Sequence, residues 1–350
     1  MRQRLWLATM AAWLASAACG WAQFRDDPPE GNGAGDIAVQ RWRIGMIIIA
    51  EGSGFRSIVG TVTVPADWPE QRVRAVEEDI SSGVSVTYQT VEDTARQMVI
   101  KVPSLAAGQQ VKAVVTFETR RVLSRAPEET DRLTAPNPRR PDRKLATHLG
   151  PSAYIESTHP EIRKLAKEIG TEKKAAWEHV EAIYDWVREK IQYREDKDQP
   201  PKSALSALHD GTGACDEMTS LFIAICRAAG IPARTVRVPG HCYPEFYLLD
   251  AEGKGHWYPC QASGSRAFGR MPDPRPILQK GDNVPGVDPR TKKKVRHRFL
   301  PETLVGLPVG SGGSLRPQLV CEQVKEKDQG ARTKDQGSGT NGRGASDNDQ

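Results

Sequence analysis

The sequence predicts an α+β protein with three parts: an N-terminal antiparallel β-sandwich, a domain of helices packed on an antiparallel sheet, and a disordered C-terminal tail. Three observations lead to this prediction. Short runs rich in β-branched residues fill residues 37–125, and apolar residues at helical spacing begin beyond residue 145. The final 29 residues, from Glu322, contain no aromatic residue and only one large aliphatic residue, Val324.

Length and charge set the outer limits. The chain of 350 residues is long enough for about two domains. With 38% hydrophobic and 27% charged residues, it has the composition of a globular protein. Its net charge of +5 is modest for this size, so we expect no nucleic-acid partner.

The chain begins with the pattern of an export signal. A basic start precedes an apolar run at residues 5–18, which is too short to span a membrane comfortably, and small residues follow up to Ala22. We therefore predict a signal peptide over residues 1–22, export to the periplasm or the extracellular space, and no stable membrane span. Lipidation at Cys19 is the less favoured alternative, because the usual aliphatic residue does not precede it.

Residues 37–125 are expected to form an accessory β-sandwich, since they carry no constellation of catalytic residues. Proline and charged residues dominate residues 126–144, which we interpret as a linker. The basic stretch 289–298 is interpreted as a solvated loop or strand edge. The strands expected in the sandwich are 37–49, 57–65, 84–91, 96–103 and 111–123.

Helical patterns dominate after the linker. Each helix is predicted from apolar spacing and from its end signals, and Gly211 and Gly230 are stop signals. Trp177 and Tyr184 fall on the apolar face of their helix and are expected in the core. The predicted helices cover 161–170, 173–192, 202–210 and 215–229, and strands follow over 234–250, around Gly240, and over 255–263.

Cys215 falls in the first turn of a predicted helix, with Thr212 or Gly213 as the expected cap. Unpaired backbone amides and the helix dipole favour a thiolate at this position. Removal of the signal peptide leaves five cysteines, so at least one thiol stays free or pairs between chains. Cys226 faces the predicted core and is interpreted as a small buried side chain.

A thiol nucleophile needs an imidazole base and a group that orients the imidazole. His241 and His256 both lie on predicted strands after the helix, and spacing alone does not choose between them.

Three segments in order resemble the transglutaminase-like superfamily. Residues 211–234 (GTGACDEMTSLFIAICRAAGIPAR) are similar to the motif that holds the nucleophilic cysteine, and residues 241–248 (HCYPEFYL) to the motif that holds the histidine. Residues 257–261 (WYPCQ) match part of the third motif, W-x-P-x-D. The resemblance covers about residues 145–265 and implies a papain-like transglutaminase core, which we expect to span residues 145–321.

The resemblance implies that Cys215 is the nucleophile and His241 its base, with Gln261 at the position of the usual aspartate. A glutamine carbonyl can accept a hydrogen bond from an imidazole N–H, as a neutral amide does in papain-like enzymes. It cannot stabilise an imidazolium by charge. Glu245 and Asp250 are candidate substitutes for the missing carboxylate.

The expected activity is that of a thiol enzyme acting on amide or peptide bonds through a thioester, with hydrolysis favoured over crosslinking and no cofactor or metal. The expected partner is a peptide or protein substrate, which includes cell-envelope material. A catalytically weakened scaffold that binds such material is the alternative. A zinc site would need the ligands His241, Cys242, His256 and Cys260. It is disfavoured because no short C-x-x-C spacing is present. A Cys242–Cys260 disulfide is preferred to it.

Overall fold

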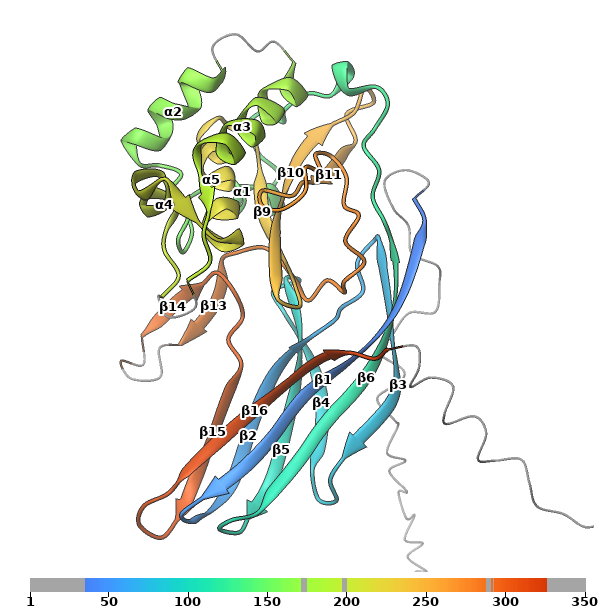
Figure 1. The fold of residues 1–350 in the computed structure, drawn as a ribbon, viewed down its shortest axis with the longest axis vertical. Coiled ribbons are helices and arrows are strands. Elements are labelled where there is room, and N and C mark those ends of the chain that lie inside the picture. Colours follow the sequence, from blue (N-terminus) through green and yellow to red (C-terminus); the bar gives the residue numbers. More distant parts are fainter. Residues whose placement is uncertain (1–34, 171–174, 197–199, 288–290, 292, 326–350) are drawn as a thin grey trace, which may run out of the picture.

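The computed structural model describes residues 35–170, 175–196, 200–287, 291 and 293–325. The predicted signal peptide and residues 326–350 of the predicted tail lie outside this part. The described chain is α+β, as predicted, with helices gathered at one end of the long axis and a sandwich at the other (Figure 1).

Two antiparallel sheets form the sandwich. The first has the order β16-β1-β6-β3, and the second contains β4, β5, β2 and β15. Side chains alternate between core and solvent along the strands, and those facing inward, such as Ile44, Met98 and Phe117, form one apolar cluster. The bounds are β1 Ile37–Glu51, β2 Gly54–Val64, β3 Gln71–Ile80, β4 Ser85–Val91, β5 Ala95–Leu105, β6 Gln110–Val122, β15 Thr303–Val309 and β16 Ser314–Gln323.

The sequence patterns missed β3. Val73 and Ala75 of this strand are buried against the core, but Arg74 separates them and acidic residues follow from Glu77. The apolar alternation therefore covers only Val73 and Ala75, which is too short a signal to distinguish a strand from a polar loop.

The last two strands return to the sandwich, although their residues fall in the range predicted for the second domain. β15 pairs with β2, and β16 pairs with β1 over ten residues. Glu322, predicted to begin the disordered tail, instead continues β16 and bonds to Arg43 at 2.7 Å. Both strands cover an edge and are mostly exposed, so their sequences lack a core pattern.

Helices cover the sheet formed by β9, β10 and β11, as the sequence predicted for this region (Figure 1). Helix α5 lies in the centre of this layer, and its residues from Glu217 to Arg227 are all buried. The bounds are α2 Pro160–Gly170, α3 Ala176–Lys190, α4 Ala204–Asp210, α5 Cys215–Ala228, β9 Ala233–Val238, β10 His241–Leu249 and β11 Gly255–Pro259.

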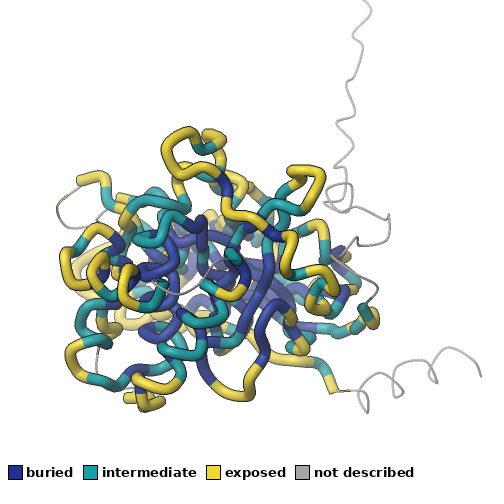
Figure 2. Tube along the Cα trace, turned by 90° about the horizontal axis from the view of Figure 1, so that it is seen from above, coloured by how far each residue is buried: buried dark blue, intermediate teal, exposed yellow. Residues whose placement is uncertain are grey.

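Buried segments gather in the middle of the molecule when it is viewed along its long axis (Figure 2). Under the helices, Trp177 and Tyr184 pack edge-on or tilted against other rings, which confirms them as core residues. The remaining rings of this cluster are Phe222, Phe246, Tyr258 and Phe268.

Short elements join the two parts. Strand β12 (Gln279–Lys280) pairs with β9 on one side and with β5 on the other, so one sheet continues from the helical layer into the sandwich. Within the described residues, no helix is long and apolar enough to cross a membrane. The other short elements are η2 Thr130–Arg132, α1 Arg143–Ala146, β7 Gln192–Tyr193, β8 Thr212–Gly213, β13 Val284–Val287 and β14 Lys294–His297.

Candidate active site

Cys215 is the first residue of helix α5, as the sequence predicted. The cap is different from the one expected: Ala214 is the N-cap residue, and the carboxylate of Glu217 accepts the Ala214 N–H at 2.9 Å. The same carboxylate accepts the N–H of Lys202 at 3.0 Å. Glu217 therefore fixes the start of the helix and the loop that faces it.

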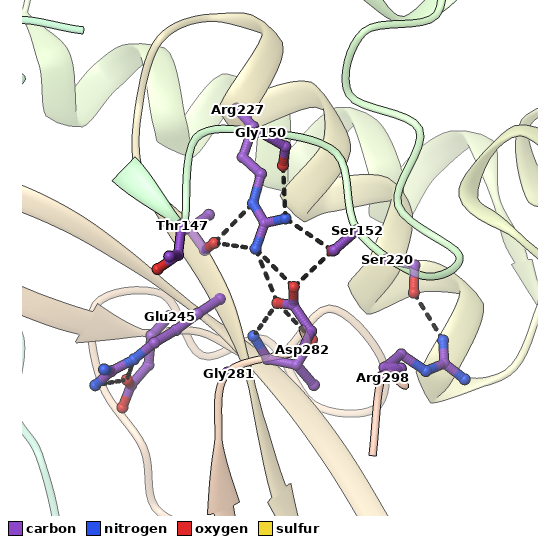
Figure 3. A network of polar contacts seen from close by, with 12 residues as sticks. Thr147, Gly150, Ser152, Ser220, Arg227, Glu245, Gly281, Asp282 and Arg298 are labelled. Carbon is purple, nitrogen blue, oxygen red and sulfur yellow. Dashed lines mark hydrogen bonds and ion pairs between the residues drawn. The ribbon is translucent and has the colours of Figure 1, made fainter. Parts of the chain in front are cut away.

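Arg298 holds the Cys215 end of the helix from the side. It donates to Ser220 Oγ at 2.8 Å (Figure 3). It also donates to the Asp216 carbonyl at 3.2 Å and pairs with the Asp216 carboxylate at 3.0 Å. Arg298 itself is 4% exposed, so these bonds are largely shielded from water. The orientation of Asp216 beside the nucleophile is thus set from outside the helix.

A buried ion pair anchors the opposite end of α5. Arg227 donates to both carboxylate oxygens of Asp282 at 2.9 Å, and also to the carbonyls of Gly150 and Ala233 (Figure 3). Ser152 Oγ donates to the same carboxylate at 2.6 Å. Asp282 follows β12 after Gly281, and β12 belongs to the same sheet as β10, so this network joins the helix to the sheet that carries His241.

His241 begins β10, and its Nε2 lies 2.9 Å from Gln261 Oε1. A carbonyl oxygen only accepts, so Nε2 carries the proton and Nδ1 is left to face Cys215. Burial lowers the pKa of His241, but its hydrogen bonds with Cys215 and Gln261 outweigh this and raise the pKa above its ordinary value. The structure therefore brings Cys215, His241 and Gln261 into one chain of hydrogen bonds.

The other candidates for these roles lie elsewhere. His256 bonds to Asp250 at 2.8 Å, and it pairs with Leu248 near the far end of β10. Glu245 is 3% exposed and is held by Arg234 and by Lys280, each at 2.8 Å. Neither Glu245 nor Asp250 reaches the His241 ring, so neither replaces the missing aspartate.

Cys242 is the site residue that sequence reasoning placed wrongly. We preferred a Cys242–Cys260 disulfide to a zinc site, but Cys242 and Cys260 are both free thiols. Cys260 donates its N–H to the Pro244 carbonyl at 3.0 Å, so it lies diagonally from Cys242. Diagonal neighbours are about 7–8 Å apart, which is too far for a disulfide.

Cys242 instead points to the start of α5. Its Sγ lies 2.8 Å from Asp216 Oδ1, and it also hydrogen-bonds to Cys215. The single thiol proton can serve one acceptor at a time, so a thiolate on Cys215 competes with the Asp216 carboxylate for it. In the sequence, the only sign that Cys242 belongs to the site was its position next to His241. Adjacent side chains on a strand point to opposite faces, so the sequence indicated that Cys242 and His241 diverge.

The surroundings of Cys215 favour its thiolate. The hydrogen bond from Cys242 is the largest influence; together with a second bond from His241 it overcomes burial and lowers the pKa of Cys215 to about 5. Asp216 acts in the opposite sense through its negative charge. A thiolate is the reactive form of cysteine, so these contacts favour the reactive form of Cys215.

Cys215 and His241 open onto a cavity of about 680 Å³. Tyr193 and Phe299 provide aromatic surface at its walls, and charged residues of both signs surround them. The cations are Arg194, Lys202 and Arg237, and the acidic residues are Glu195, Asp196, Asp216 and Glu217. Neither sign dominates, so the cavity is not built for a strongly charged polymer.

Among the described residues, one group of metal-ligand types comes together: Cys215, Asp216 and Cys242, whose ligand atoms lie within 4.8 Å of one another. This group contains the activated thiol, so a metal there would block it. The four residues considered for zinc in the sequence do not gather, because His256 and His241 lie at opposite ends of β10.

Comparison with known proteins gives one family match and several similar structures. Residues 163–262 match the model of the transglutaminase-like superfamily. The fold is similar to the crystal structure of a candidate cysteine protease from Cytophaga hutchinsonii, with a TM-score of 0.52 and 17% identity, covering 83% of this chain and 93% of that one.

Two further structures are more distant. The periplasmic domain of TgpA from Pseudomonas aeruginosa has a TM-score of 0.31 and 15% identity, covering 63% of this chain and 87% of that one. A candidate protease from Parabacteroides distasonis has a TM-score of 0.27 and 13% identity, covering 67% and 48%. No curated protein matches the sequence of this chain.

Proposed function

We propose that this chain, which over residues 163–262 belongs to the transglutaminase-like superfamily, is a thiol enzyme that acts on amide or peptide bonds through Cys215. The observation that carries the proposal is the hydrogen-bonded series Cys215, His241 and Gln261 at the wall of a cavity. It supplies a nucleophile, a base and an orienting group in the order that such chemistry requires.

In the proposed reaction, the Cys215 thiolate attacks the amide carbonyl, and the backbone N–H of Cys215 at the helix start helps to stabilise the oxyanion. His241, as imidazolium, gives its proton to the leaving amine or ammonia, which leaves a thioester on Cys215. Water activated by neutral His241 then releases the acid. The Gln261 carbonyl holds the ring through both steps.

We favour water over an amine as the acceptor of the acyl group. The cavity is lined by cations and carboxylates in similar number, and no acidic pocket set apart for an incoming lysine is evident among its described walls. A peptide or protein, including peptide-containing cell-envelope material, fits a cavity of mixed charge with two aromatic walls. Export through the predicted signal peptide would bring the enzyme to such material.

The alternative function is a scaffold that binds the same class of material without turning it over. Gln261 favours this alternative, because without a carboxylate the imidazolium lacks a charged partner. The activated state of Cys215 favours the enzyme, since a binding scaffold has no use for a stabilised thiolate.

The two functions separate in a comparison of the wild type with Cys215→Ala, which removes the nucleophile and keeps a small side chain. Both proteins are incubated with a casein-type substrate, and peptide cleavage, ammonia release and incorporation of a fluorescent amine are measured. The enzyme predicts at least one activity in the wild type and none in Cys215→Ala. Equal binding of substrate by both proteins, with no turnover by either, would establish the scaffold.

A further inference from the structure

We propose that Cys215 and Cys242 form a redox-reactive pair, in which oxidation of Cys215 by a hydroperoxide is resolved by Cys242 to give a reversible Cys215–Cys242 disulfide. The structure places both sulfurs and an Asp216 carboxylate oxygen within 4.8 Å of one another. The two thiols come from different elements, the start of α5 and the start of β10. A bond of about 2.05 Å between the sulfurs therefore requires only a short approach of two side chains.

The pair is asymmetric in a way that suits an attacking and a resolving thiol. Cys215 lines the cavity, so a small oxidant can reach it, whereas Cys242 is 2% exposed. The hydrogen bond to Cys215, together with burial, keeps the pKa of Cys242 well above its ordinary value, so Cys242 stays protonated. A peroxide thus meets one thiolate, that of Cys215.

Asp216 supplies the base for the second step. Its Oδ1 lies 2.8 Å from the Cys242 sulfur, and Arg298 fixes its other oxygen at 3.0 Å. The carboxylate therefore already faces the proton that Cys242 must lose when it attacks. The negative charge of Asp216 raises the pKa of Cys215 and so opposes the thiolate. The position of Asp216 beside Cys242 is therefore not explained by activation of Cys215.

The two steps balance. The Cys215 thiolate attacks the hydroperoxide and takes its hydroxyl oxygen as the O–O bond breaks, giving a sulfenic acid on Cys215; the leaving alkoxide or hydroxide takes a proton from the His241 imidazolium and departs as alcohol or water. Cys242 gives its proton to Asp216 and attacks the Cys215 sulfur. The S–O bond breaks, and the leaving hydroxide takes that proton from Asp216 and departs as water. The sum is two thiols and one peroxide giving a disulfide, an alcohol or water, and one further water. Two equivalents of a small thiol, or one of a dithiol, then reduce the disulfide to the two cysteine thiols and are themselves oxidised to a disulfide.

The other described thiols are not placed to resolve oxidised Cys215. Cys226 and Cys260 are buried in the apolar cluster under the helices, and Cys321 lies on β16 of the sandwich. The proposed disulfide rests on the proposed function only in that both require a reactive Cys215 thiolate; it does not require acyl transfer. Amide turnover without a disulfide would overturn this inference alone, and a disulfide without amide turnover would overturn the proposed function alone.

The test treats the full chain with one equivalent of hydrogen peroxide in the presence of a chelator, blocks free thiols, and digests it with trypsin without reduction. Cys215 then lies in the peptide Ser203–Arg227 and Cys242 in Val238–Lys254. We expect these peptides to be joined, with fragmentation assigning the bond to Cys215 rather than to Cys226. Oxidised Cys215 with no joined peptide would overturn the proposal.

The recovery of Cys215 reactivity after oxidation and reduction is a second, independent measure of the disulfide. After excess peroxide and then dithiothreitol, wild type and the matched control Cys321→Ser should regain the alkylation rate of Cys215. Cys242→Ser should regain about tenfold less, because its unresolved sulfenic acid is oxidised by further peroxide to a sulfinic acid that dithiothreitol does not reduce. Full recovery in a folded Cys242→Ser or Cys242→Ala protein would contradict the role of Cys242. Asp216→Asn should allow a sulfenic-acid trap such as dimedone to capture more Cys215, and capture equal to wild type would contradict the role of Asp216.

Discussion

The Oε1 atom of Gln261 lies 2.9 Å from Nε2 of His241, and the motif resemblance assigns an aspartate to the position of Gln261. The backbone of Gln261 is itself fixed: its N–H donates to the Ala267 carbonyl at 2.8 Å, and its own carbonyl accepts from Arg188 at 3.0 Å. The amide is therefore a positioned acceptor. It can orient the His241 ring, but it supplies no charge to the imidazolium.

Replacing Gln261 tests this orienting role. Gln261→Ala removes one hydrogen bond to a charged ring, worth about 1.5–3 kcal/mol, and should slow turnover roughly ten- to hundredfold. Gln261→Asp should raise the pKa of His241 and shift the basic limb of the rate–pH profile to higher pH. A Gln261→Ala rate equal to wild type, or an unmoved basic limb in Gln261→Asp, would count against the role.

The thiol of Cys242 should control the acidity of Cys215. Cys242→Ala removes the largest influence that lowers the pKa of Cys215 to about 5, so this pKa should rise. Cys242→Ser keeps a donor and should stay nearer to wild type. The pH dependence of Cys215 alkylation, followed by mass spectrometry, measures the change; identical midpoints in wild type and Cys242→Ala would contradict it.

Breaking the buried pair Arg227–Asp282 should destabilise the helical layer. Asp282→Asn leaves a buried guanidinium without its counter-charge, and we expect a loss of about 3–5 kcal/mol in the free energy of unfolding. Arg266→Ala, which removes an exposed pair with Asp185, is the control and should cost no more than about 1 kcal/mol. Urea unfolding of the two variants measures the losses. Similar losses for Asp282→Asn and Arg266→Ala would disprove the stabilising role of the buried pair.

The same pair predicts an acid dependence. Burial alone would raise the pKa of Asp282, but Arg227 lowers it below its ordinary value. A lowered pKa contributes stability that is complete above the unfolded value of about 3.9 and is lost as the pH falls further. The stability advantage of wild type over Asp282→Asn should therefore shrink below about pH 4. A constant advantage down to pH 2–3 would exclude this linkage.

The final strands should be needed by the sandwich that they complete. A chain ending at Glu302 lacks β15 and β16, which cover the edges of β2 and β1 and place Leu304 and Leu315 against the core. It should unfold at lower urea than a chain ending at Lys325, which keeps both strands. Equal midpoints would mean that these strands add nothing to the sandwich.

Local patterns predicted much of this molecule. Helical spacing and the stop signals at Gly211 and Gly230 identified the helices around Cys215, and ordered motifs identified His241 and the position of Gln261. Pairing between strands far apart in the sequence could not be predicted from local patterns. β16 shows no core pattern because it covers an edge, and its partner β1 lies at the other end of the chain. The contact between Cys242 and Asp216 depends on how a strand meets a helix end, which spacing does not encode.

The central claim is that Cys215 is a thiolate stabilised beside His241. The most direct test is the second-order rate of iodoacetamide alkylation of Cys215 in the wild type from pH 3 to 10, resolved from the other thiols by mass spectrometry. The account predicts a rate that is half-maximal at about pH 5 and high throughout the neutral range. A midpoint at about pH 8.5, the value of an ordinary cysteine, would contradict it.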